Sequence, residues 1–276
     1  MRKQQMTVAA VQMNCDLENW EANTKKAGRL IEEAVKQGAE FIVLPELFNT
    51  GYRVEENDSI LAESIPGKTS HWMTDIAQEH SITLVACYME KSEDKVYDVA
   101  VAADETGVIG RYRKTYLWDR EKERFSFGHS DLEPFNIDGD VQVGLQICYE
   151  VGFPEPSRLL TLNGADIIVY PSAFGKARSH VWDIATRARA IENGIFVIAA
   201  NRTGTEKSET VFGGKSRIVS PSGDVLQEAT REDDVIVATI NLADVDKQRR
   251  RIPYLEDLDT RLYNETRLVA KERREN

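Results

Sequence analysis

Three residues whose side chains can do covalent chemistry stand at the ends of predicted strands. Cys148 closes the apolar run 141–147 and precedes the turn-like stretch VGFPEP. Glu46 follows the apolar stretch FIVLP, and Lys114 ends the stretch GRYRK. A thiol becomes a strong nucleophile when it loses its proton, and a carboxylate base beside a lysine cation can bring this about. These residue types predict nucleophilic catalysis, provided that the fold brings them together.

Taken one at a time, Glu46 and Lys114 favour ordinary roles. A carboxylate in a loop and a lysine in a basic cluster are usually solvated. A free cysteine near a strand is usually a small buried apolar residue, and this interpretation fits Cys87, whereas Cys15 has no supporting context. Cys148 differs because it ends its strand and precedes a turn into a helix. The N-terminus of that helix and a nearby lysine would both favour the thiolate.

The sequence argues against several other kinds of site. The chain has four histidines, and none stands at a predicted strand end, which disfavours a Cys–His protease. No His and Cys residues are clustered with the spacing of metal ligands, so we expect no metal. The stretch GGKS at 213–216 is not a phosphate-binding loop, because Glu209 stands where the earlier glycine is required. We expect no cofactor either.

The composition is typical of a soluble globular protein. The 276 residues carry a formal net charge of −11, which argues against nucleic acid as a partner. No apolar run approaches the length of a membrane span, and the start MRKQQMTVAAVQMN lacks the apolar stretch of a signal peptide. Three cysteines in a chain of this length do not indicate a disulfide framework. We therefore expect a cytoplasmic protein with free thiols and no membrane partner.

The elements that must position these residues alternate between strands and helices. Apolar periodicity predicts helices over 17–37, 67–81, 154–163 and 179–193, with strands between them. Buried Val/Ile/Ala strands and hairpins, such as the one that turns at 221–224, predict mixed sheets in a layered α/β protein with helices outside. Sites in open α/β sheets lie beyond the carboxyl ends of the strands. The three strand-end residues match that rule.

Longer motifs around these residues resemble the nitrilase superfamily of carbon–nitrogen hydrolases. The matching stretches are VLPELF, RYRKTYLW and LQICYEVGFPEPSR, followed along the chain by GADIIVYPSAF, RARAIENGIFVIAANRTG and GGKSRIVSPSGDVL, with AAVQMN at the start. They cover nearly the whole chain. The resemblance implies a Glu–Lys–Cys triad with Glu46 as the base, Lys114 as the cation and Cys148 as the nucleophile. It also implies a second acidic residue, which the pattern REKxxF places at Glu121, with Glu123 as the alternative.

The same resemblance implies a fold and an assembly. The family fold is a four-layer α-β-β-α sandwich of two mixed β-sheets with outer helices, here as one domain over residues 1–276. Family members commonly dimerise, so we expect a homodimer or a higher homo-oligomer. The C-terminal extension from about residue 244 would take part in that assembly. The family implies no metal or cofactor.

The residues after Cys148 restrict the range of possible substrates. Relatives that act on acidic amides often read CYDxRFPE, and their arginine can meet a substrate carboxylate, whereas this chain has Gly152 at that position. Arg178 or Arg202 could still reach in from another loop. The sequence thus favours a small neutral or apolar carboxamide, hydrolysed to carboxylic acid and ammonia through a cysteine thioester. The expected pocket walls are Tyr52, Tyr149, Ala173 and Phe174.

Several alternatives stay open. The main one is an N-carbamoyl amine amidohydrolase, although Val151 and Gly152 supply no arginine after the cysteine. An ω-amidase and a nitrilase are further ones, and Tyr149 stands where nitrilases typically carry tryptophan. The alternative from a different class is a catalytically silent relative used as a binding module. The intact Glu–Lys–Cys set argues against it.

Overall fold

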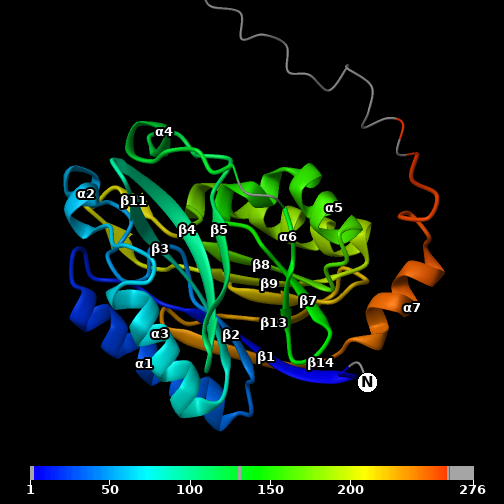
Figure 1. Ribbon diagram of the computed structural model, residues 1–276. Helices are drawn as coiled ribbons and strands as arrows, with labels where there is room; N and C mark the ends of the chain where they lie inside the picture. Colours follow the sequence, from blue (N-terminus) through cyan, green and yellow to red (C-terminus); the bar gives the residue numbers. More distant parts are fainter. Residues whose placement is uncertain (1–2, 130–131, 260, 262–276) are drawn as a thin grey trace, which may run out of the picture.

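The computed structural model describes residues 3–129, 132–259 and 261, and it has four layers (Figure 1). Two six-stranded sheets pack face to face, and helices cover the outer face of each sheet. Strands that carry apolar side chains on both faces need cover on both faces, and this arrangement provides it. The predicted α-β-β-α sandwich is confirmed.

The first sheet comes mainly from the N-terminal half of the chain. Its order is β14 (Asp234–Asn241), β1 (Gln5–Gln12), β2 (Phe41–Val43), β3 (Thr83–Ser92), β4 (Lys95–Asp104) and β5 (Gly107–Arg113). Strands β1, β2 and β3 are parallel, and the remaining pairs are antiparallel. Strand β1, the first strand of the described chain, pairs along its whole length with β14, the last one.

The second sheet has the same design. Its order is β13 (Val225–Glu228), β12 (Arg217–Val219), β9 (Phe196–Asn201), β8 (Ile167–Ser172), β7 (Val141–Leu145) and β6 (Phe135–Ile137). Three neighbouring strands, β7, β8 and β9, are parallel, and antiparallel strands flank them. The predicted hairpin at 221–224 joins β12 to β13. The predicted strand 141–147 ends as a regular strand at Leu145.

All four predicted helices form. Helices α1 (Trp20–Lys36) and α3 (Lys68–His80) cover the first sheet, and α5 (Pro154–Leu162) and α6 (Ser179–Asn193) cover the second (Figure 1). Helix α1 begins three residues later than predicted, because the side chain of Asn19 caps it by accepting the N–H of Ala22 at 3.1 Å.

Alternating side chains along the strands fill two separate parts of the core. In β1, Val8 and Ala10 lie in the core between the two sheets, whereas Ala9 and Val11 pack beneath α1 and α3. All four side chains are buried. The central strands therefore read as continuous apolar runs, which is why the sequence predicts strands buried on both faces.

Short elements lie in the connections between the longer strands and helices. They are η1 (Glu55–Asn57), α2 (Asp58–Leu61), α4 (Glu121–Arg124), η2 (Cys148–Gly152), η3 (Lys176–Arg178), β10 (Thr205–Glu206) and β11 (Thr210–Val211). Residues from η1, α4, η2, η3 and β11 line one cavity. The regular sheets thus supply a rigid base, and the short elements surround the opening.

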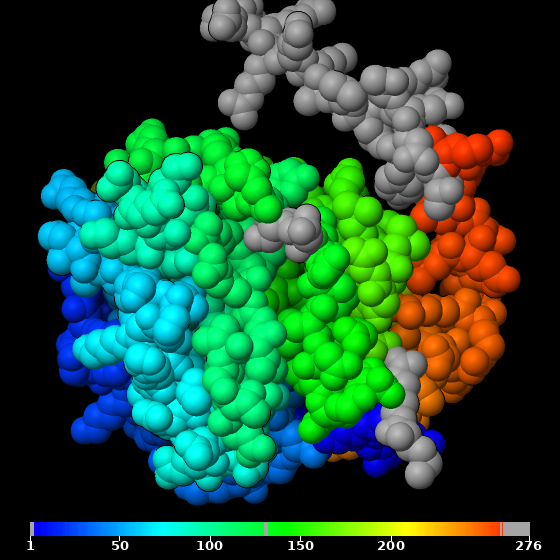
Figure 2. Space-filling view, viewed as in Figure 1, coloured from blue at the N-terminus to red at the C-terminus, as the bar shows by residue number. Residues whose placement is uncertain are grey.

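Helix α7 (Ala243–Arg251) begins the predicted C-terminal extension and lies at one edge of the molecule, drawn in orange in Figures 1 and 2. Arg249 donates hydrogen bonds to the backbone carbonyls of Ala165 at 2.8 Å and Asn193 at 3.4 Å, which docks the helix beside the second sheet. Its role in oligomerisation stays a prediction. Within the described chain, no helix combines the length and apolar character needed to cross a membrane.

Candidate active site

The structure brings the three strand-end residues together where the two sheets meet. Glu46 lies three residues beyond β2, Lys114 directly follows β5, and Cys148 lies three residues beyond β7. The side chains of Glu46 and Lys114 have no exposed surface, and Cys148 is 6% exposed. The first sheet supplies the carboxylate and the amine, and the second supplies the thiol. The site is therefore complete only when the sheets are packed together.

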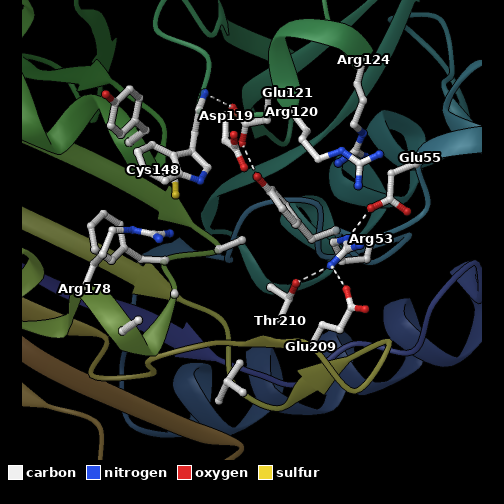
Figure 3. A pocket seen from close by; sticks show the side chains of 18 residues that line it. Arg53, Glu55, Asp119, Arg120, Glu121, Arg124, Cys148, Arg178, Glu209 and Thr210 are labelled. Atoms are coloured by element: carbon white, nitrogen blue, oxygen red, sulfur yellow. Dashed lines mark hydrogen bonds and ion pairs between the residues drawn. The ribbon is translucent and has the colours of Figure 1, made fainter.

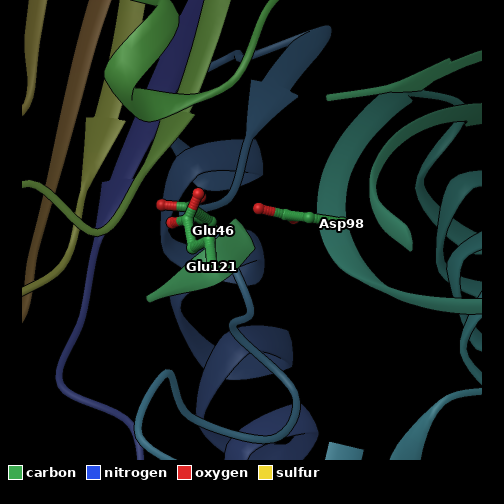
Figure 4. Close-up of side chains that lie close together, drawn as sticks. All are labelled: Glu46, Asp98 and Glu121. Carbon is green, nitrogen blue, oxygen red and sulfur yellow. The ribbon is translucent and has the colours of Figure 1, made fainter. Parts of the chain in front are cut away.

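Lys114 is surrounded by three carboxylates. Its Nζ lies 2.5 Å from Oε1 of Glu46, 2.8 Å from Oε2 of Glu121 and 3.1 Å from Oδ2 of Asp98. Figure 4 shows these three acidic side chains gathered at one point. Such a set of oxygens would suit a hard metal ion. The ammonium group of Lys114, however, already lies within hydrogen-bond distance of all three, so the lysine acts as the cation of this cluster.

Burial and charge shift the pKa values of this cluster. The pKa of Glu46 lies well above its usual value because burial penalises the carboxylate; Lys114 acts in the opposite direction, and the charges of Asp98 and Glu121 add to the increase. Burial alone would lower the pKa of Lys114, but the carboxylates outweigh it and raise that pKa well above its usual value. Lys114 therefore stays charged, and Glu46 has the proton affinity that a general base needs.

Glu46 is oriented by the backbone of the second sheet. Its Oε2 accepts the N–H of Ala173, directly after β8, at 2.7 Å. The N–H of Glu46 itself donates to the carbonyl of Ser172 at 3.4 Å. The hydrogen bond from Ala173 uses the carboxylate oxygen that does not contact Lys114, so both oxygens of Glu46 are held in place.

Cys148 occupies a sharp backbone turn. Its φ of 46° lies in the left-handed region, which residues other than glycine rarely adopt. The turn starts η2, and Cys148 lines the cavity there instead of continuing in a strand. Backbone strain of this kind persists only where surrounding contacts hold it, and it is common at functional sites.

Burial and the neighbouring carboxylate oppose the thiolate that a helix N-terminus and a nearby lysine would favour at Cys148. Burial raises the pKa of Cys148 well above its usual value, and Glu46 raises it further through its charge and a hydrogen bond. Lys114 lowers this pKa, but it does not reverse the increase. The thiol therefore keeps its proton and lies next to the carboxylate that can take it.

Glu150 holds the turn against the segment that follows Lys114, a role that was not predicted from the sequence. Its Oε2 accepts the N–H of Ile147 at 2.8 Å, on the cysteine side. Its Oε1 accepts the N–H of Thr115 at 2.8 Å and the hydroxyl of Tyr112 at 2.7 Å, on the lysine side. One buried carboxylate thus links the two sheets beside the site.

The structure distinguishes the two candidates for the second acidic residue. Glu121 is buried at the start of α4, where it accepts the hydroxyl of Tyr52 at 2.6 Å and the N–H of Trp118 at 2.7 Å, besides its contact with Lys114. Glu123 is exposed on the same helical turn. Only Glu121 therefore lies in the site.

A cavity of about 500 Å³ opens over Cys148 (Figure 3). The four predicted pocket residues all line it, together with Cys148 and Glu121; they are Tyr52, Tyr149, Ala173 and Phe174. The position of these side chains matches the expectation, and their contact with a substrate stays a prediction. A cavity of this size suits a small molecule.

The two arginines considered from the sequence differ in position. Arg178 lines the cavity. Arg202 is buried elsewhere, in an ion pair with Glu206 and against the ring of Phe212 at 4.7 Å. Asp98 was not predicted as a site residue; it stands inside the apolar strand stretch KVYDVAVAAD. An acidic residue within such a run is a signal that could have been used, because buried carboxylates need a partner.

Comparison with known proteins gives a consistent result. A family model described as "Carbon-nitrogen hydrolase" matches residues 7–250. A nitrilase of Pyrococcus abyssi is 40% identical over 258 residues, covering 91% of this chain and 95% of that protein. A 2-oxoglutaramate amidase of Bacillus subtilis is 35% identical over 262 residues, covering 93% of this chain and 99% of that protein.

The solved structures give the same picture of the fold. A double mutant of the amidase from Nesterenkonia sp. AN1, in complex with acrylamide, matches with a TM-score of 0.83 and 28% sequence identity. The match covers 96% of this chain and 98% of that chain. The whole described sandwich, and not only the surroundings of the cysteine, is thus shared.

Proposed function

Because this chain belongs to the carbon–nitrogen hydrolase family, we propose that it hydrolyses the carboxamide group of a small molecule to a carboxylic acid and ammonia. One observation carries the proposal. Glu46 lies 2.5 Å from the ammonium group of Lys114, and both charges act on the thiol of Cys148, which lines a cavity sized for a small molecule. This is a base, a cation and a nucleophile in mutual reach.

The first step forms the carbon–sulfur bond. Glu46 takes the thiol proton while the sulfur of Cys148 attacks the amide carbon, and the carbonyl electron pair moves to oxygen. Lys114 and the backbone N–H of Tyr149, at the start of η2, would stabilise the negative charge on that oxygen. Lys114 can do so because the surrounding carboxylates keep it protonated.

The second step breaks the carbon–nitrogen bond. Protonated Glu46 gives its proton to the nitrogen, the carbonyl re-forms, and ammonia leaves a thioester on Cys148. Glu46 then takes a proton from a water molecule that attacks the thioester. The carbon–sulfur bond breaks, the carboxylic acid leaves, and Glu46 returns the proton to the sulfur. Glu121 positions Lys114 and the hydroxyl of Tyr52 throughout.

An amide is the preferred substrate because of the relatives and the cavity. The Bacillus subtilis protein is named an amidase, and the Nesterenkonia structure is an amidase with bound acrylamide. The aromatic walls Tyr52, Tyr149 and Phe174 would contact a short acyl chain. Gly152 removes one partner for a substrate carboxylate, but Arg178 lies in the cavity, so a neutral acyl chain does not follow from Gly152 alone.

The test is ammonia release from a panel of short amides, N-carbamoyl compounds and nitriles, measured for the wild type and Cys148→Ala. Ammonia from amides that depends on Cys148, with an acyl adduct by intact mass spectrometry, is the expected result. Carbon dioxide released together with ammonia would identify a carbamoylase instead. No turnover and no adduct in folded protein would contradict the proposal and favour a binding module.

We also propose a homodimer or higher homo-oligomer that forms through α5 and α6. These neighbouring helices carry exposed apolar side chains on the outside of the second sheet, namely Leu159, Leu162, Ile184 and Ile191. Clustered apolar side chains on a surface favour association. Light scattering would show a mass of at least two chains, and replacement of Ile184 by Asp would reduce it.

A further inference from the structure

One buried carboxylate, that of Glu150, joins two segments that meet beside the site, and its side chain has no exposed surface. Its Oε2 accepts the N–H of Ile147 at 2.8 Å. Its Oε1 accepts the N–H groups of Thr115 at 2.8 Å and Tyr116 at 3.1 Å. The same oxygen accepts the hydroxyls of Thr115 at 2.9 Å and Tyr112 at 2.7 Å. These donors are uncharged N–H and O–H groups, and their fixed directions hold the carboxylate in one orientation.

These hydrogen bonds reach the immediate neighbours of the nucleophile and of the cation. Ile147 directly precedes Cys148 and follows β7 of the second sheet. Thr115 directly follows Lys114 and β5 of the first sheet. The side chain of Glu150 thus spans from the residue before the thiol to the residue after the ammonium group. The separation of those two groups therefore depends on the length of this side chain.

The turn that carries Cys148 needs an anchor of this kind, because its φ of 46° is strained. The backbone N–H of Glu150 closes the turn on the carbonyl of Ile147 at 3.0 Å, while its carboxylate accepts the N–H of the same residue. Both backbone polar groups of Ile147 are therefore bonded to Glu150. Tyr149, whose N–H would stabilise the oxyanion, lies inside this closed turn.

Aromatic side chains pack along the same contact between the two segments. Tyr116 stacks on Phe153 with ring centroids 4.0 Å apart, and Trp118 packs against Tyr149 at 4.8 Å. Ring pairs are favourable over a range of separations and tilts, whereas hydrogen bonds weaken steeply when they are misaligned. The rings hold the segments together, and the carboxylate of Glu150 sets their exact alignment.

We infer that Glu150 is a positioning residue for the reaction: it fixes the separation between the thiol of Cys148 and the ammonium group of Lys114. This inference rests on the proposed function. Glu150 does not line the cavity, so it acts through its neighbours and not on the substrate. A misplacement of about 1 Å between reacting groups can cost about a hundredfold in rate.

The first test is Glu150→Asp, which keeps the charge but is one methylene group too short to bond to both segments. For a short amide, kcat should fall by about ten- to a hundredfold, whereas KM should stay close to that of the wild type. Tyr112→Phe combined with Thr115→Val keeps Glu150 but removes two hydroxyl donors, so its loss should be smaller, about three- to tenfold. Ile31→Val, on the buried face of α1 in the other part of the core, is the control for stability and should keep wild-type kinetics.

Alkylation of Cys148 by iodoacetamide, followed by intact mass spectrometry over a range of pH, reports on the same geometry without turnover. Lys114 lowers the pKa of this thiol, whereas Glu46 and Glu121 raise it. The N–H of Ala173 holds Glu46 to the second sheet, so Glu46 stays beside the thiol if Lys114 shifts. The pKa of the thiol should then rise, and the alkylation profile should move to higher pH.

Glu150→Asp should show this shift, the double hydroxyl variant a smaller one, and Ile31→Val none. Glu150→Gln separates geometry from charge. Loss of a negative charge by itself would lower the pKa of the thiol, so a shift to higher pH in this variant also supports positioning. A wild-type alkylation profile in folded Glu150→Asp, or a loss confined to KM, would overturn the inference.

If Glu150→Asp does not fold, the double hydroxyl variant decides, and wild-type kcat together with a wild-type alkylation profile in it would overturn the inference. The alkylation measurement also separates the inference from the proposed function. A shifted profile without hydrolysis of any amide supports the positioning role, and only the proposed reaction fails. Hydrolysis at the wild-type kcat in folded Glu150→Asp supports the reaction and overturns the positioning role.

Discussion

Two buried thiols in this protein have almost the same chemical neighbours. The charge of Glu46 acts on Cys148, and Glu46 lies 2.5 Å from Lys114. Cys87 lies 3.0 Å from Oδ1 of Asp98, whose other oxygen lies 3.1 Å from the same Lys114. Burial raises the pKa of both thiols well above the usual value, and the neighbouring carboxylate adds to the increase in each case. One lysine thus links two thiol–carboxylate pairs.

The two thiols differ in access and in backbone. Cys87 lies within β3, is completely buried, and faces Ala100 in the ladder between β3 and β4. Cys148 has left the regular strand, has a φ of 46° and lines the cavity. A thiol beside a carboxylate and a lysine is therefore not enough to make a nucleophile. The turn that presents Cys148 to the cavity is the distinguishing feature.

The largest expected effect separates the two thiols directly. Cys148→Ala should lower ammonia release on the order of 10⁴-fold or more, because the covalent intermediate cannot form. Cys87→Ala should leave most of the activity, because no substrate reaches that thiol. Steady-state kinetics of both variants on one amide is the measurement. A comparable loss of activity in Cys87→Ala, with the fold shown to be intact by circular dichroism, would contradict the conclusion that Cys148 alone is the nucleophile.

The next largest loss of activity is expected on replacement of Glu46, the carboxylate beside Cys148. Glu46→Gln keeps the shape of the side chain but removes the base, so kcat should fall by about 10²- to 10⁴-fold. The neutral amide can still accept the N–H of Ala173, so the loss should not reflect unfolding. Single-turnover kinetics with intact mass spectrometry should show slower formation of the acyl adduct. A normal adduct rate would remove Glu46 from the role of base.

Replacement of Asp98, the carboxylate beside Cys87, should have a smaller effect on activity, visible mainly in its pH dependence. Glu46 must be ionised to act as a base, so activity falls as the pH drops through its raised pKa. Asp98 contributes to that increase, and therefore Asp98→Asn should move the acid limb of kcat/KM to lower pH. A pH–rate profile of wild type and variant checks this. A shift to higher pH, or none, would contradict it.

The smallest expected effect is that of Cys87→Ala on the stability of the fold. Cys87→Ala removes one well-packed sulfur atom from the core between the sheets, which should lower the free energy of unfolding by about 1 kcal/mol. Urea denaturation followed by fluorescence measures this change. A loss several times larger would mean that the contact between Cys87 and Asp98 holds the lysine cluster together, and the two thiols would then be functionally coupled.

The sequence was enough for the residues that stand at strand ends. Glu46, Lys114 and Cys148 follow apolar runs, and their order along the chain matched a family pattern whose fold the structure confirms. The helices were predicted because their apolar periodicity and capping signals are local. Their ends shifted by a few residues, as with Asn19, where a single side chain sets the start.

Residues that act across elements could not be found in this way. Asp98 reaches Lys114 because β4 pairs with β5, with Val99 opposite Arg113, and this register depends on the whole sheet. Glu150 matters because its two oxygens bridge segments of different sheets. Arg178 was noted from the sequence, but its stacking on Trp118 depends on two loops that meet only in the folded chain.

The pairing of β1 with β14 has a consequence for how this protein is made. The strand that opens the chain receives its outer neighbour only when residues 234–241 have been synthesised. At translation rates of about 5–20 residues per second, β1 would wait roughly 10–50 s with the backbone N–H and C=O groups of one edge unpaired. The sheet that carries Glu46 and Lys114 thus closes only after residue 241 has been made. A nascent chain released before β14 would lack that closure and expose an aggregation-prone edge, so activity and escape from aggregation are gained together.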